Sequence, residues 1–273
     1  DPEIEAFYWI RRVAFENALG NYTPPRLQVR LRQFHVDDPG HTPDKGWKRL
    51  VPAPLLSTHL VPGDHLSMTM DPAHRAVLAQ ALFDHIVDTP DNLNAVSTQD
   101  DREALVAMSG SDAQGNPLVL IPGAGASVTS LLPFQDALRV ARPVLGLQPR
   151  GIDLRHIPHS TVEAAATANL AALREELGRG RPPHLVGHSY GGLVVFEMAR
   201  QLEALGQPVA SLTLVDTAPP GNPAREHDLR DHEIHERVAY ARQGALGGTL
   251  DVDFGALRSL TRSAFLASLH TAM

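Results

Sequence analysis

The 273-residue chain contains no cysteine. Disulfides, thiolate metal sites and a cysteine nucleophile are therefore excluded, and the composition is compatible with a reducing, cytoplasmic location. Aromatic residues make up only 5%, and no apolar run approaches the roughly 20 residues of a transmembrane helix, so no membrane association is expected. The 24 Lys and Arg residues are outnumbered by 31 Asp and Glu, and no long basic run occurs. Nucleic acid is not an expected partner, because phosphate binding needs clustered cations.

A Gly-x-Ser-x-Gly motif occupies residues 187–191, between an apolar run and a segment of helical periodicity. The pattern is typical of a nucleophile elbow, in which flanking glycines allow a sharp strand-to-helix turn that exposes the serine at the head of the helix. Ser189 is therefore the candidate nucleophile. A glycine-rich turn with a serine that has no catalytic role would give the same short motif. The choice between the two interpretations therefore depends on whether the rest of the sequence offers catalytic partners for Ser189.

Short apolar runs alternate with helical segments from Pro117 onward, as in a parallel doubly wound sheet. This alternation predicts strands over 118–121, 143–147, 184–187 and 212–216, with helices around 131–140, 162–177 and 193–205. The run 160–163 (Ser-Thr-Val-Glu) indicates a capping box at the start of the second helix. Before Pro117, strands are expected over 28–34 and 56–61, and helices over 1–20 and about 72–87.

An acyl-transfer serine needs a base, an acid that orients the base, and donors for the oxyanion. Asp216 ends the expected strand over 212–216 and fits the acid of an α/β-hydrolase, although a helix cap or a turn would also use an aspartate. In this fold the oxyanion donors are the N–H after the serine, here that of Tyr190, and one in the loop after an early strand, here around Ala124.

The base is harder to place, because the histidine of an α/β-hydrolase normally follows the acid along the chain. Downstream of Asp216 only four histidines remain, all in segments predicted as helical cover: His227, His232, His235 and His270. His65 has the expected surroundings instead, since it follows a strand and a Gly-Asp turn and precedes a helix. A surface loop histidine is the competing interpretation.

Five stretches carry a more specific signal: 62–68 (Pro-Gly-Asp-His-Leu-Ser-Met), 120–127 (Leu-Ile-Pro-Gly-Ala-Gly-Ala-Ser), 147–151 (Leu-Gln-Pro-Arg-Gly), 187–192 (Gly-His-Ser-Tyr-Gly-Gly) and 214–221 (Leu-Val-Asp-Thr-Ala-Pro-Pro-Gly). Together they resemble the type I thioesterase domains of nonribosomal peptide synthetases and polyketide synthases. The resemblance runs through nearly all of the chain. It implies an α/β-hydrolase fold, with a mostly parallel doubly wound sheet and a helical lid, and a triad of Ser189, His65 and Asp216.

The order of the segments departs from that family. Residues 1–92 resemble the last third of the family's domain and residues 93–273 its first two thirds. Joining Met273 to Asp1 would restore the family's order, which favours one circularly permuted domain over a slice through two tandem thioesterases. A permuted domain would comprise a lid helix (1–20), the C-terminal part with the histidine motif (21–92), a linker (93–116), the N-terminal sheet core (117–216) and lid helices (217–273).

The resemblance implies a serine hydrolase that releases a peptidyl or acyl chain from the phosphopantetheine thioester of a carrier protein, by hydrolysis or macrocyclisation. A stand-alone editing thioesterase or a general esterase is the alternative in the same class. A catalytically incomplete carrier-docking fragment of tandem thioesterases is the alternative outside it. No metal or bound cofactor is expected, and the only partner implied is the carrier protein with its acyl or peptidyl substrate. If residues 1–20 belong to the lid, substrate contact falls to Phe7, Tyr8 and Trp9.

Two other histidine features have simpler interpretations. His227, His232 and His235 alternate with acidic residues, but a solvated lid helix is expected there rather than a metal site. His188 directly precedes the candidate nucleophile, and its side chain is expected to point away from that of Ser189 and to serve packing.

Overall fold

The computed structural model of the chain describes residues 14, 15, 17–87, 104–109, 115–152, 156 and 158–220. Contacts divide the chain into two compact units, Asp1–Asn222 and Pro223–Met273, and every described residue belongs to the first. Three of the predictions therefore lie outside the described residues: the lid helices from 221 onward, the helix over residues 1–13, and the substrate contacts Phe7, Tyr8 and Trp9. Within 14–21, every described residue is helical, as expected.

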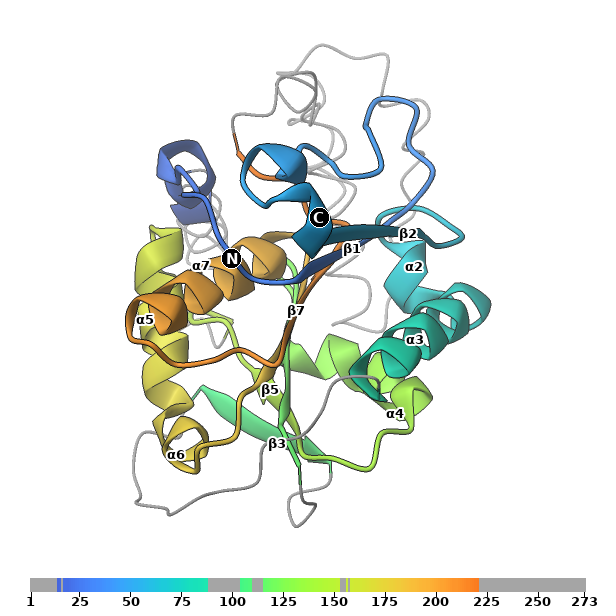
Figure 1. The fold of residues 1–273 in the computed structure, drawn as a ribbon. Helices are drawn as coiled ribbons and strands as arrows, with labels where there is room; N and C mark the ends of the chain where they lie inside the picture. The colour runs from blue at the N-terminus through green and yellow to red at the C-terminus, as the bar shows by residue number, and fades with distance from the viewer. Residues whose placement is uncertain are drawn as a thin grey trace, which may run out of the picture. The chain divides into compact units, whose positions relative to one another are not determined.

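The described strands form one seven-stranded sheet in the order β2-β1-β7-β6-β4-β5-β3 (Figure 1). Neighbouring strands are parallel, except that β3 runs antiparallel to β5 at one edge. The strands are β1 (Leu31–His35), β2 (Leu56–Leu60), β3 (Leu105–Ser109), β4 (Leu118–Ile121), β5 (Val144–Leu147), β6 (His184–His188) and β7 (Ser211–Val215). The mostly parallel sheet confirms the predicted α/β-hydrolase class.

Helices cover both faces of this sheet (Figure 1). Side chains alternate across a strand, so Val119 and Ile121 of β4 pack with α5 (Val162–Ala172) and α7 (Tyr190–Ala204) on one face. Leu118 and Leu120 pack with α3 (Pro72–Val87) and α4 (Leu132–Leu138) on the other. All of β4 is buried. Burial on both faces explains why β4 is a continuous apolar run in the sequence.

Shorter elements connect these layers. They are the α-helices α2 (Ser67–Met70) and α6 (Arg174–Gly178) and the 3₁₀ turns η1 (Trp47–Arg49), η2 (Ala53–Leu55) and η3 (Val128–Leu131). None of the helices in the described part of the chain is long and apolar enough to cross a membrane.

The structure differs from three predictions about the elements. The segment 93–116, expected to be a linker, contains strand β3, which pairs with β5 at the edge of the sheet. The capping box expected from Ser160 and Glu163 is also absent, because the N-cap of α5 is Thr161, whose hydroxyl oxygen accepts the Ala164 N–H at 3.1 Å. The helix expected over 162–177 is divided at Leu173, between α5 and α6.

The first two strands of the chain, β1 and β2, extend the sheet on the outer side of β7, which is the last strand of the chain that the structure describes. β1 pairs in parallel with β7, with Leu31 opposite Leu212, and β2 pairs outside β1. All four of β1, β2, β6 and β7 run in the same direction, so their carboxyl ends meet at one edge of the sheet. Ligands of open α/β sheets bind at this edge. His65, Ser189 and Asp216 all follow the carboxyl end of one of these strands.

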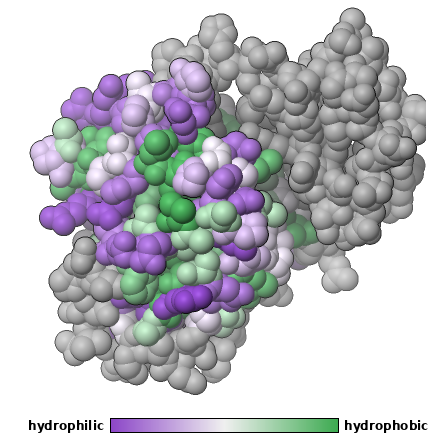
Figure 2. Space-filling view, turned by 90° about the vertical axis from the view of Figure 1, so that its right-hand side faces the viewer, coloured by the Kyte–Doolittle hydropathy of each residue, from purple (hydrophilic) through white to green (hydrophobic). Residues whose placement is uncertain are grey.

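The surface seen in Figure 2 mixes hydrophobic and hydrophilic residues. Two of the large apolar side chains that are exposed among the described residues, Leu66 and Met70, come directly after the His65 turn. The others are Leu60, Val77, Val106, Leu132 and Leu205.

Candidate active site

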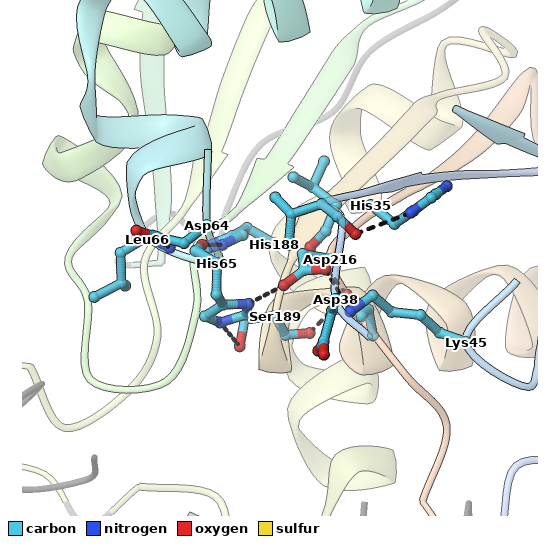
Figure 3. Close-up of polar contacts among 12 residues, drawn as sticks. His35, Asp38, Lys45, Asp64, His65, Leu66, His188, Ser189 and Asp216 are labelled. Atoms are coloured by element: carbon cyan, nitrogen blue, oxygen red, sulfur yellow. Dashed lines mark hydrogen bonds and ion pairs between the residues drawn. The ribbon is translucent and has the colours of Figure 1, made fainter. Parts of the chain in front are cut away.

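The structure brings Ser189, His65 and Asp216 into one hydrogen-bonded chain (Figure 3). Nε2 of His65 lies 3.0 Å from Oγ of Ser189, and Nδ1 of His65 makes a short hydrogen bond with Oδ2 of Asp216. The His65 and Asp216 side chains are 21% and 4% exposed, so one end of this chain is accessible and the other is buried. The buried Asp216 carboxylate fixes the orientation of the His65 ring, and Nε2 on the other side of the ring contacts the Ser189 hydroxyl.

Ser189 sits at a strained strand-to-helix turn. It is the N-cap of α7, with φ 54° and ψ −121°, a backbone conformation that residues other than glycine rarely adopt. A Cβ on Gly187 would lie 2.2 Å from the Gly191 carbonyl oxygen, and one on Gly191 would lie 2.4 Å from the Pro122 carbonyl oxygen. The flanking glycines are therefore needed for close backbone packing. Neither is among the described residues with positive φ, so the sharp turn is made by the serine itself.

Asp216 directly follows β7 and is held by the neighbouring strand. Its N–H donates to the Phe34 carbonyl oxygen of β1 at 2.7 Å, and its φ of 46° is also left-handed. Burial by itself would raise the pKa of the Asp216 carboxyl, but the hydrogen bond from His65 and the positive charges of His65 and Lys45 outweigh it. The net result is a pKa well below the usual range, so this carboxyl is ionised at neutral pH.

The turn that carries His65 is fixed by its neighbour Asp64. Oδ1 of Asp64 accepts the N–H groups of Leu66 and Ser67 at 2.9 and 2.8 Å, and the Asp64 N–H donates to Oγ of Ser67 at 2.8 Å. The Ser67 N–H and, to a smaller extent, the Leu66 N–H hold the pKa of Asp64 below its usual value. An ionised Asp64 thus preorganises the turn that presents the His65 ring.

Two backbone groups lie where an oxyanion would need donors. Tyr190 is the first residue of α7, so its N–H has no carbonyl acceptor one helical turn earlier. The loop after β4 passes directly beside the serine, since a Cβ on Gly123 would lie 3.3 Å from the Ser189 Cβ. Ala124 follows in this loop and is exposed. The assignment of Tyr190 and Ala124 as oxyanion donors stays a prediction.

Two contacts of the site were not predicted from the sequence. Nζ of Lys45 forms an ion pair with Oδ1 of Asp216 at 2.6 Å, opposite the oxygen that His65 uses (Figure 3). His188 is also wrongly interpreted as pointing away, because its ring stacks on that of His65, with 5.0 Å between the ring centroids. Its Nε2–H donates to the His65 carbonyl oxygen at 3.1 Å.

A further contact joins the same loops through the backbone. Trp47 is fully buried, and its indole N–H donates to the Thr217 carbonyl oxygen at 2.8 Å. The Thr217 hydroxyl in turn donates to the Ser189 carbonyl oxygen at 2.9 Å. Trp47, in the segment after β1, and Thr217, after β7, therefore support the turn at Ser189 as well as the backbone next to Asp216.

In the part of the chain that the structure describes, no three or more His, Asp or Glu side chains are grouped to hold a metal ion. His227, His232 and His235 lie outside that part. The predicted absence of a metal and a cofactor therefore remains a prediction.

The arrangement suits acyl transfer through a covalent intermediate. Because the ionised Asp216 carboxylate can only accept a hydrogen bond, Nδ1 of His65 carries the donated proton. In a neutral His65 ring, Nε2 is then the nitrogen that can accept the Ser189 hydroxyl proton. A positive charge on the His65 ring would be stabilised by the Asp216 carboxylate.

Comparison with known proteins agrees with this chemistry. The family model for the thioesterase domain matches residues 116–261, more than half of the chain. This match contains Ser189 and Asp216, whereas His65 precedes it. The fold and the family match together identify an α/β-hydrolase fold.

Individual relatives are much longer proteins. The chain is 32% identical over 153 residues to indigoidine synthase of Dickeya dadantii (strain 3937), covering 56% of this chain and 9% of that protein. It is 34% identical over 128 residues to nonribosomal peptide synthetase apvA of Aspergillus terreus, covering 46% of this chain and 13% of that one. Among solved structures, the type II thioesterase BorB from the borrelidin biosynthetic cluster is 25% identical, with a TM-score of 0.41, over 57% of this chain and 63% of that one.

Proposed function

Because the chain belongs to the thioesterase domain family, we propose that it releases a peptidyl or acyl chain from the phosphopantetheine thioester of a carrier protein. The observation that carries this proposal is the 3.0 Å contact between His65 Nε2 and Ser189 Oγ, with His65 Nδ1 on the buried Asp216 carboxylate. The carrier partner is supported by the relatives, which include a nonribosomal peptide synthetase.

The proposed reaction has two halves. Ser189 Oγ attacks the thioester carbonyl while His65 Nε2 takes its proton, and the N–H groups of Tyr190 and Ala124 bind the resulting oxyanion. Collapse breaks the C–S bond, and His65 returns the proton to the leaving thiolate. Water then attacks the acyl-enzyme to give a free acid, or an amine or hydroxyl of the acyl chain attacks to give a ring.

Acyl-pantetheine thioesters test the proposal directly. The expected result is thiol release by the wild type and a loss of about 10³-fold or more in kcat for Ser189→Ala, because the residual rate relies on the oxyanion donors alone. Ser57→Ala, at the start of edge strand β2, is the matched control and should keep full activity. Equal rates for Ser189→Ala and the wild type would overturn the proposal. Mass analysis of the product separates hydrolysis from cyclisation.

We also propose that residues 1–92 and 93–273 complete a single catalytic domain in permuted order. This is supported by strands β1 and β2, which continue the sheet beyond β7, and by the reach of His65 to Ser189. The alternative is a tandem slice or a swapped dimer, in which the histidine of one copy serves the serine of another.

Mixing two inactive variants separates these alternatives. If each chain holds a whole triad, a mixture of His65→Ala and Ser189→Ala stays as inactive as its components. If the triad forms between copies, unfolding and refolding the mixture should restore up to about a quarter of the wild-type activity, since half of random dimers are mixed and each has one intact site.

A further inference from the structure

We propose that Lys45 is a positioning residue for this reaction: its ammonium group holds one oxygen of Asp216 and offsets part of the negative charge that faces His65, so that the reaction continues at lower pH than it would without Lys45. This proposal rests on the proposed function, because it assigns Lys45 a role through the triad. It adds a residue outside the thioesterase match, which begins at residue 116.

The two oxygens of Asp216 are divided between two partners. Nζ of Lys45 lies 2.6 Å from Oδ1, and Nδ1 of His65 bonds to Oδ2. The Lys45 and Asp216 side chains are only 6% and 4% exposed, so little solvent screens the pair. A buried lysine is uncommon unless it is paired, and this one is paired with the acid of the triad.

Lys45 reaches Asp216 from a strained backbone conformation. Lys45 has a left-handed φ of 46°, and its N–H donates to the Thr42 carbonyl oxygen at 2.8 Å. Four non-glycine residues in the described part of the chain have a left-handed φ, and three of them are Ser189, Asp216 and Lys45. Strain of this kind persists where the surrounding structure requires it, and it gathers at functional sites.

A second anchor prevents this loop from moving away. Two residues beyond Lys45, the buried Trp47 donates its indole N–H to the carbonyl oxygen of Thr217, the residue after Asp216. Lys45 therefore contacts the side chain of Asp216 while Trp47 contacts the backbone of the next residue. Such double anchoring fixes both the position and the rotamer of the carboxylate.

The charge of Lys45 has a predictable sign. Serine attack converts His65 to imidazolium, which Asp216 stabilises. A cation on the far oxygen of Asp216 offsets part of that stabilisation. If this cation is removed, the rate of reaction should therefore begin to fall at a higher pH as the solution is made more acidic.

Other titratable groups also lie near this set. Asp38 and His41, in the loop after β1, form an ion pair at 2.6 Å. Burial would raise the pKa of Asp38, but the hydrogen bond from the Gly40 N–H, the contact with His41 and the positive charge of Lys45 lower it overall. Asp64 lies beside His65, and His188 stacks on it from the end of β6. The side chains of all of these residues are retained when Lys45 alone is replaced, although Asp38 also loses the nearby positive charge of Lys45.

The test uses the full chain and an alkyl fluorophosphonate, which reacts with the activated serine and needs no natural substrate. The second-order labelling rate of Ser189 is measured from pH 5 to pH 9 for the wild type, Lys45→Met and Lys45→Arg. Lys48→Met is the matched control, because Lys48 lies in the same segment of the chain and is exposed. Thermal unfolding at pH 7 checks that each variant is folded.

The acid limb of the Lys45→Met profile should move up by roughly one pH unit, while Lys45→Arg and Lys48→Met keep the wild-type limb. A Lys45→Met profile that only loses amplitude, with its acid limb in place, would show a merely structural role and overturn the proposal. If Lys45→Met does not fold, Lys45→Gln carries the same test. If the wild type is not labelled at Ser189 at any pH, the proposed function itself fails, whatever Lys45 does.

Discussion

The ring of His188 stacks on the ring of His65 at an interplanar angle of 29°. Its Nε2–H also donates to the carbonyl oxygen of His65, although the two residues are 123 positions apart in the sequence. Since His188 ends β6 and Ser189 follows it, the same strand end holds the proposed nucleophile and the turn of its proposed base. His188 therefore supports the turn of His65 without being one of the three residues proposed to form the triad.

Removing this support should impair the reaction. His188→Ala is expected to lower kcat/KM for an acyl-pantetheine thioester by roughly 10- to 100-fold, because a misplaced base loses its alignment with Ser189. His59→Ala is the matched control, since His59 also contacts another ring, that of Phe34, but lies exposed on β2. Steady-state kinetics give the comparison. Equal losses in the two variants would contradict a positioning role for His188.

Stability should depend on the ionisation of Asp216. The pKa of its carboxyl is lower in the folded chain than in the unfolded chain, so its contribution is present above the unfolded value of 3.8 and is lost as pH falls below it. Between about pH 5 and pH 2.5, the melting temperature of the wild type should therefore fall more steeply than that of Asp216→Asn. Thermal unfolding across this range tests the sign, and parallel curves would contradict it.

The close packing of the elbow gives a sharp test of the fold. Gly191→Ala places a Cβ 2.4 Å from the Pro122 carbonyl oxygen, a backbone atom that cannot rotate away, and should lower the free energy of unfolding by at least about 2 kcal/mol. Gly20→Ala is the control, because a helical Gly20 has nothing within 4 Å of an added Cβ. Its expected effect is a stabilisation of up to about 1 kcal/mol. Chemical denaturation gives both values, and equal effects would exclude this account of the elbow.

The parts of the fold that depend on local pattern were predictable. β4 is buried on both faces and is a continuous apolar run, while β6 and β7 are short, mostly buried strands that Ser189 and Asp216 directly follow. His65 could be proposed from its strand, its Gly-Asp turn and the family resemblance. The edge strand β3 was missed because it is only partly buried and lies in a polar, turn-rich segment.

Long-range contacts were not predictable. Nothing near Lys45 in the sequence indicates that its side chain reaches Asp216, and Trp47 and Thr217 are 170 positions apart. The error at His188 has a local cause. Alternation along a strand sends neighbouring side chains to opposite faces, but β6 ends at His188 and the left-handed backbone of Ser189 breaks the alternation.

The central claim is that Ser189 is the nucleophile, and the intact mass of the protein after incubation with an alkyl fluorophosphonate tests it most directly. The wild type should gain the mass of one adduct, located at Ser189 by peptide mapping, and Ser189→Ala should gain none. Equal labelling of the wild type and Ser189→Ala would contradict the account.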